Sequence, residues 1–153
     1  MNTALDREPN DLPKGISLQT LQVEKMEAIL SSLAEQCPAQ RVLLAESMGQ
    51  VIASGGTEKF ANPEGLAALI GGYISAGQAI TFLTETKPIR QSILREGLDT
   101  ITFISEVDQE LILFAQVSKT VPLGWARLII QNACQQLENL MACPPESNTN
   151  PRL

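Results

Sequence analysis

The longest uncharged segment of the chain constrains its fold most strongly. From Gly65 to Thr84 the sequence contains no Asp, Glu, Lys or Arg. About 20 residues are enough to cross a bilayer as a helix. This segment, however, holds several glycines and polar residues, lies between Glu64 and Glu85, and has no basic anchors nearby. We therefore expect a buried helix of a folded domain rather than a membrane span.

The two flanks of this helix need two separate covers. Larger residues recur every three or four positions along one flank, and the opposite flank is built from small residues. A second copy of the chain can cover one flank while the sheet covers the other, and loops of the same chain are the alternative cover. The two sets are Leu66, Leu69, Ile70, Tyr73, Ile74, Gly77 and Ile80, and Ala67, Ala68, Gly71, Gly72, Ser75, Ala76 and Ala79.

Periodicity and turn residues place the other elements. Helical spacing predicts a first helix over Leu18–Gln36 with Ser17 as its cap, and Asn62 before Pro63 predicts the start of the uncharged helix. The last helix is predicted to start at Pro122. Apolar alternation and turn signals predict five strands, over Arg41–Glu46, Gln50–Ser54, Ile89–Glu96, Thr100–Val107 and Glu110–Ser118.

The element order defines the fold class. It reads helix, two strands, helix, three strands, helix, and strands joined by tight turns are antiparallel. Gly49 is expected to supply a positive φ in the first hairpin turn. Arg41–Glu46 is apolar at both alternating sets of positions, which is typical of a strand covered on both faces. We therefore predict a three-layer α/β (α+β) domain, with helices on both faces of a five-stranded antiparallel sheet.

The two ends of the chain differ from its middle. Residues 1–15 and 143–153 are rich in proline and polar residues, which predicts a flexible leader and a disordered tail. The single folded domain is therefore expected to cover residues 16–142.

Composition and charge exclude several classes of function. The net charge is −6 and the 11 basic residues are scattered, which disfavours binding to nucleic acid or to an anionic membrane surface. The chain contains no histidine, and its cysteines do not have the spacing of metal ligands, so we expect no metal and no cofactor. Reduced thiols fit a cytoplasmic protein, and the expected partner is another protein.

Candidate catalytic residues are few. Glu106, Asp108 and Glu110 surround one hairpin, where solvent rather than a pocket is expected. No histidine is present to activate a serine. We therefore predict a protein that is not an enzyme.

Two segments resemble roadblock/dynein light chain domains. Residues 47–55 read SMGQVIASG and are similar to the family's first hairpin, where a glycine turn leads into a strand ending in Ala-Ser. Residues 121–128 read VPLGWARL and are similar to the start of its last helix, which commonly reads Pro-Leu-Gly, an apolar residue and Arg-Leu. The order of elements agrees from Leu18 to Met141. An acidic residue often stands in the family where this chain has Ser47, which leaves the subfamily open.

The resemblance implies a profilin-like sheet and a mode of action. Family members form homodimers or heterodimers through the central helix and the strand after it, which joins two sheets into one. They act as dynein light chains, lysosomal scaffold subunits or bacterial partners of Ras-like GTPases. In the bacterial systems the dimer can stimulate GTP hydrolysis without giving an arginine finger. The implied function is a dimeric cytoplasmic adaptor that docks a Ras-like GTPase, and a small-ligand sensor is the alternative.

The central helix and the strand after it give the predicted sites. A partner contact is further predicted for Arg90, Arg95 and Trp125, with ordinary surface charge and packing of the tryptophan between helix and sheet as the alternatives. The predicted dimer interface comprises Leu66, Leu69, Ile70, Gly72, Tyr73, Ala76, Ile80, Ile89 and Ile93.

Overall fold

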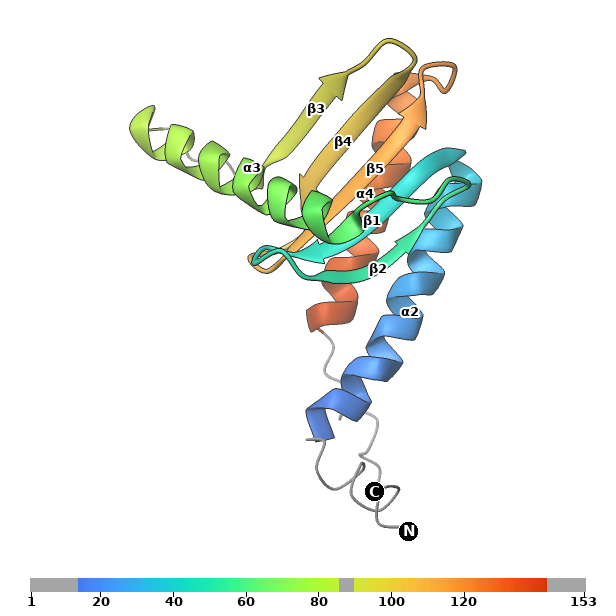
Figure 1. Cartoon of the computed structure of the whole chain (residues 1–153), viewed down its shortest axis with the longest axis vertical. Coiled ribbons are helices and arrows are strands. Elements are labelled where there is room, and N and C mark those ends of the chain that lie inside the picture. Colours follow the sequence, from blue (N-terminus) through green and yellow to red (C-terminus); the bar gives the residue numbers. More distant parts are fainter. Residues whose placement is uncertain (1–13, 86–89, 143–153) are drawn as a thin grey trace.

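The computed structural model of the chain describes residues 14–85 and 90–142 (Figure 1). Its elements follow the predicted order of helix, two strands, helix, three strands and helix. They are α2 (Lys14–Gln36), β1 (Ala39–Glu46), β2 (Val51–Gly55), α3 (Pro63–Leu83), β3 (Ser92–Glu96), β4 (Thr100–Glu106), β5 (Leu111–Ser118) and α4 (Leu123–Ala142).

The five strands form one antiparallel sheet in the order β2-β1-β5-β4-β3. Helices α2 and α4 pack on one face of this sheet, and α3 alone crosses the other face (Figure 1). The predicted three-layer fold class is therefore confirmed. The two faces of the sheet are covered unequally, because one face has two covering helices and the other has one.

The central strand β1 separates two hydrophobic cores. Val42 and Leu44 point into the larger core beneath α2 and α4, whereas Leu43 and Ala45 point into the smaller core beneath α3. All four side chains are fully buried. The prediction that this strand is covered on both faces is confirmed, and the period of two along a strand explains the division.

Two local predictions are confirmed at turns. Gly49 has a φ of 101° in the β1–β2 hairpin, a conformation that costs glycine little. At the start of α3, the side chain of Asn62 accepts a hydrogen bond from the backbone N–H of Gly65 at 3.0 Å. Both features fix where α3 meets the sheet.

The largest difference from the predicted elements is the start of the first helix. Helix α2 begins at Lys14, four residues before the predicted Leu18, so Gly15 and Ser17 lie within the helix rather than before it. A single glycine costs a helix only about 1 kcal/mol, which the rest of a long packed helix outweighs. Residues 1–13 and 143–153, the remainder of the predicted leader and the predicted tail, lie outside the described residues.

Candidate protein-interaction surface

The inward face of α3 is narrow. Its buried residues are Ala67, Ile70, Gly71 and Ile74, which are spaced as one face of a helix. They pack on the smaller core, which includes Ile104, Ile112 and Phe114. This face takes residues from both predicted flanks, so the division into a large and a small flank is wrong.

Gly71 explains the rotation of α3. A Cβ atom at this position would lie 2.6 Å from the backbone oxygen of Ser47 in the β1–β2 hairpin. The hairpin backbone therefore approaches the helix at Gly71, and the neighbouring Ile70 turns inward with it. Ile70, one of the predicted dimer residues, is 2% exposed and packs in the smaller core, away from the exposed face of α3.

The opposite face of α3 is apolar and uncovered. Leu69 is 72% exposed, Ile80 is 61% exposed and Leu83 is 77% exposed. A Cβ at Gly72 would meet no atom within 4 Å. We call this stripe the α3 surface, and its members, which recur every three or four positions, are Leu69, Gly72, Tyr73, Ala76, Ile80 and Leu83.

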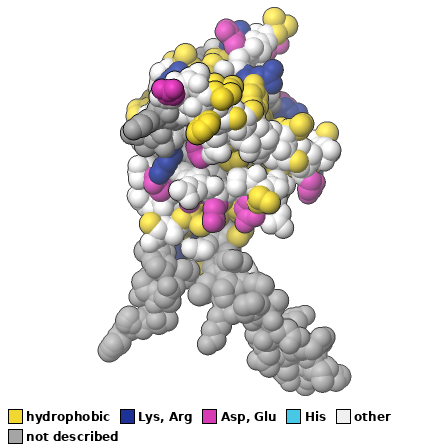
Figure 2. All heavy atoms as spheres, turned by 90° about the vertical axis from the view of Figure 1, so that its left-hand side faces the viewer, with side chains coloured by type: hydrophobic (Ala, Val, Ile, Leu, Met, Phe, Trp, Pro, Cys, Tyr) yellow, Lys and Arg dark blue, Asp and Glu magenta, His cyan; other side chains and the backbone are white. Residues whose placement is uncertain are grey.

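Helix α3 extends past the edge of the sheet that it crosses. Phe82 lies on the same side of the helix as the inward-facing Gly71 and Gln78, yet it is 81% exposed. Figure 1 shows the last turns of α3 beyond β3. Figure 2 looks onto this end of the molecule, where hydrophobic side chains gather among acidic and basic ones.

Helix α3 is also the one helix of the described residues that is long and apolar enough to cross a membrane, by length and composition. Only 22% of its most hydrophobic window is buried in this single chain. Most of this apolar window is therefore exposed in the single chain.

Strand β3 is an uncovered edge of the sheet at this end of the molecule. It pairs only with β4, and its other edge carries backbone groups that have no strand partner among the described residues. Ser92, Leu94, Arg95 and Glu96 are exposed, whereas Ile93 is partly buried against the smaller core. Free edges of this kind are templates for pairing with another strand.

The predicted dimer residues thus fall into three groups. Leu69, Gly72, Tyr73, Ala76 and Ile80 lie together on the exposed α3 surface. Ile70 is buried in the smaller core with Leu66 and Ile93 partly buried against it, and Ile89 lies outside the described residues. Sequence periodicity missed Phe82 and Leu83, because only the position of the sheet edge shows that they are exposed.

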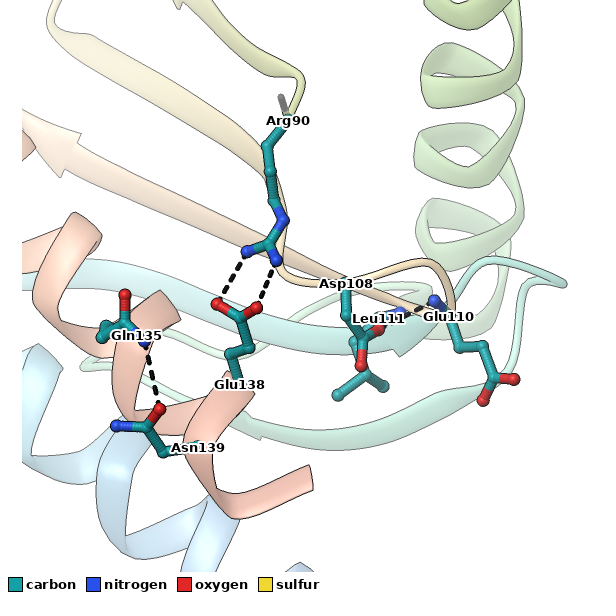
Figure 3. A network of polar contacts seen from close by, with 7 residues as sticks. All are labelled: Arg90, Asp108, Glu110, Leu111, Gln135, Glu138 and Asn139. Carbon is teal, nitrogen blue, oxygen red and sulfur yellow. Dashed lines mark hydrogen bonds and ion pairs between the residues drawn. The ribbon is translucent and has the colours of Figure 1, made fainter. Parts of the chain in front are cut away.

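The three predicted partner contacts do not share one element, because Arg90 and Arg95 lie at β3 and Trp125 lies on α4. Arg90, which precedes β3, forms a bidentate ion pair with Glu138 on α4, with 2.8 Å between Nη1 and Oε1 (Figure 3). This pair raises the pKa of Arg90 and lowers that of Glu138, mainly through the hydrogen bonds between them. Arg95 is exposed on β3, and Trp125 is 47% exposed on α4 while its Nε1 donates to the Gln36 carbonyl at 3.1 Å.

The acidic hairpin between β4 and β5 is held by a local turn. The Asp108 Oδ1 atom accepts hydrogen bonds from the backbone N–H groups of Glu110 and Leu111, each at 2.8 Å (Figure 3). No cluster of three His, Cys, Asp or Glu residues suited to a metal occurs among the residues that the structure describes. A partly open hollow of about 370 Å³ lies between this hairpin, β2, the middle of α2 and the end of α4. This geometry gives little support to the small-ligand alternative.

Comparisons with known proteins identify the fold. No protein-family model matches the chain, and no curated protein matches it either. Among solved structures, Myxococcus xanthus MglB superposes with a TM-score of 0.73 at 24% identity, over 77% of this chain and 95% of that protein. The gliding protein MglB from Thermus thermophilus gives 0.71 at 23% identity, over 78% and 90%. A Roadblock/LC7 domain from Streptomyces avermitilis gives 0.68 at 16% identity, over 76% and 98%.

The chain has the roadblock fold. A profilin from Acanthamoeba castellanii is similar at a lower level, with a TM-score of 0.52 and 10% identity over 74% of this chain and 94% of that one. The roadblock fold of this chain is therefore also profilin-like, as the resemblance of residues 47–55 and 121–128 implied.

Proposed function

We propose that this protein is a dimeric adaptor without catalytic activity of its own, and that its dimer docks a small Ras-like GTPase in the cytoplasm. The observation that carries the proposal is the uncovered apolar stripe on α3 beside the free edge of β3. The free thiols of Cys37 and Cys134 support a reducing compartment.

Burial of the α3 surface supplies the driving force for self-association. Removing apolar surface from water contributes roughly 25 cal/mol per Å². The stripe carries no charge, so two copies meet face to face without burying an unpaired ion. Gly72 and Ala76 lie in the middle of the stripe and allow two helices to approach closely. A two-fold axis through this stripe makes the interface self-complementary.

The same two-fold axis gives β3 a partner. Two β3 edges that pair across the axis join the sheets and satisfy the backbone groups of both edges. The overhanging end of α3, with Phe82 on its sheet-facing side, then lies against the second copy. Pairing therefore covers the α3 surface, the free edge of β3 and the overhanging end of α3. One of the similar structures is described as "MglB with tetrameric arrangement", which supports self-association as a property of similar folds.

The class of partner follows from the resemblance to bacterial roadblock proteins that work with Ras-like GTPases. One of the two MglB structures that superpose on this chain is named a gliding protein. A joined sheet with paired α3 helices offers a wide, rigid face for a protein partner. No arginine finger is required of it, because the proposed dimer acts by ordering the residues of the GTPase itself or by setting its location.

A charge placed in the α3 surface tests the proposal. We expect Ile80→Glu to leave the monomer folded, because Ile80 is 61% exposed, and to abolish the dimer. Burying an unpaired carboxylate in an apolar interface costs several kcal/mol, so the dissociation constant should rise by at least 100-fold in sedimentation equilibrium. The control is Gln131→Glu on the exposed side of α4, which should leave the dimer intact.

The same variants test the partner. Ras-like GTPases from the same genome, loaded with GDP or with a GTP analogue, are titrated against wild type, Ile80→Glu and Gln131→Glu. We expect one nucleotide state to bind wild type and Gln131→Glu, and the monomeric variant to bind weakly. Equal, negligible binding of every GTPase to all three proteins would contradict the GTPase proposal while leaving self-association in place.

A further inference from the structure

We propose that Gln91 is a positioning residue that sets the angle of α3, and thereby the placement of the self-association surface. This inference rests on the proposed function, because the surface that Gln91 positions is the one proposed to pair. It assigns a role to a side chain that lies outside the interface itself.

Gln91 binds the backbone of α3 directly. Its Nε2 atom donates a hydrogen bond to the carbonyl oxygen of Ile74 at 3.0 Å. Ile74 is the last fully buried residue on the inward face of the helix and is 3% exposed. This hydrogen bond therefore holds α3 at the point where its packed part ends and its overhanging part begins.

Gly77 leaves the space that Gln91 occupies. A Cβ atom at Gly77 would lie 1.9 Å from the Gln91 Oε1 atom and 2.9 Å from Cδ. Any other residue would therefore push the amide of Gln91 away from the helix. A glycine inside a helix costs about 1 kcal/mol relative to alanine. The gap that Gly77 leaves on the helix, here called the notch, is therefore destabilising, and its use as the place of the Gln91 amide explains why a glycine stands there.

Glu106 holds Gln91 from the sheet side. The backbone N–H of Gln91 donates to Glu106 Oε1 at 3.1 Å, and the Glu106 N–H donates to the Gln91 carbonyl at 2.9 Å. Glu106 Oε2 also accepts from Gln78 Nε2 of α3 at 3.3 Å. The end of β4, residue 91 and the helix thus form a closed ring of hydrogen bonds, which we call the α3 clamp.

The position of the α3 clamp gives it this role. Beyond Gln78 the helix overhangs the sheet, and Ile80, Phe82 and Leu83 are each more than half exposed. A small change of angle at Ile74 displaces those residues most, because they lie furthest from the packed part. An interface of two helices and two strand edges tolerates little displacement, since all its contacts must form together.

Arg90 provides a matched control. It precedes Gln91 in the chain but pairs with Glu138 on α4, on the opposite face of the sheet (Figure 3). Adjacent residues of an extended segment point to opposite faces, so Arg90→Gln removes a polar contact of the same segment without touching α3.

The first experiment compares Gln91→Ala, Gln91→Met and Arg90→Gln with wild type. The first readout is the dimer dissociation constant from sedimentation equilibrium. The second is the hydrogen exchange of α3 amides 75–83, measured at protein concentrations below that constant, where the protein is monomeric. We expect both Gln91 variants to raise the dissociation constant about five- to ten-fold and to speed the exchange of those amides, as suits the loss of one hydrogen bond. Arg90→Gln should change both quantities by less than two-fold.

Gly77→Ala gives a second, independent test. In the wild-type background it should displace the Gln91 amide and weaken the dimer about as much as Gln91→Ala does. In the Gln91→Ala background the notch is empty, so the same substitution should cause no further weakening, and the higher helix propensity of alanine should slow exchange in α3.

The outcomes separate this inference from the proposed function. Unchanged exchange and affinity in both Gln91 variants, or additive effects of Gly77→Ala and Gln91→Ala, would overturn the positioning role while the wild-type dimer stands. A wild-type protein that is monomeric at every concentration would overturn the proposed function. Exchange of amides 75–83 in the monomer would then still report whether Gln91 holds the helix.

Discussion

The thiol of Cys134 lies on the inner side of α4, partly buried beside Ser105 and the Arg90–Glu138 pair. Burial raises its pKa to about 11, and Arg90 and the hydrogen bond with Ser105 oppose this only in part. Burial likewise raises the pKa of Cys37. Both thiols are therefore neutral at physiological pH and are poor nucleophiles, so they serve as core residues.

The raised pKa of Cys134 predicts a pH dependence of stability. The folded state holds the thiol proton more tightly than the unfolded state, whose pKa is near the ordinary value of 9.0. The contribution of the protonated thiol to the free energy of unfolding is therefore fully present below about pH 8, and it is lost as the pH rises from about 9 toward 11. Between pH 8 and 10.5 the unfolding free energy of wild type should fall about 1–2 kcal/mol more than that of Cys134→Ala, measured by urea unfolding. Parallel pH profiles would contradict this.

Some single residues could be predicted from the sequence, and others could not. Gly49 and Asn62 obey local rules of turns and helix caps, which depend only on neighbouring residues. Arg90 and Gln91 are different, because their partners Glu138 and Ile74 are distant in the chain. No periodicity could show that Arg90, a predicted partner contact, is paired within its own chain.

Among the elements, α3 carries most of the functional argument. Its existence could be predicted from the uncharged segment Gly65–Thr84 and its start from Asn62 and Pro63, but the direction of its faces could not. That direction depends on the β1–β2 hairpin, whose backbone at Ser47 requires Gly71 to face inward. The uncovered face, which includes Leu69 and Ile80, then follows from helix geometry.

The adjacent glycines of α3 should respond to substitution in opposite ways. Gly71→Ala places a Cβ 2.6 Å from the Ser47 oxygen, and we expect a loss of about 1–3 kcal/mol in the unfolding free energy of the monomer. Gly72→Leu enters open space, so it should leave the monomer about as stable but weaken the dimer at least ten-fold. Urea unfolding at low concentration and sedimentation equilibrium distinguish the two effects. A Gly72→Leu protein that dimerises like wild type would contradict the predicted packing at this position.

At the scale of the whole molecule, the two faces of the sheet are unequally covered. Helices α2 and α4 bury the larger core, whereas α3 crosses the other face alone and overhangs β3 (Figure 1). The pairings β1–β2, β3–β4 and β4–β5 could be predicted because tight turns impose them. The pairing of β1 with β5 could not, because these strands are distant in the chain. The overhang could not, because it depends on the angle at which α3 crosses the sheet.

The mass of the wild-type protein in solution tests the central claim most directly. Sedimentation equilibrium over nanomolar to high micromolar concentrations should give twice the 16.6 kDa of one chain at the upper end, reversibly and without detergent. Flotation with lipid vesicles should leave the protein in the soluble fraction. A mass of one chain at every concentration would contradict the claim that a second copy covers α3. Recovery of the protein with the vesicles would contradict it too, because a membrane would then cover the helix.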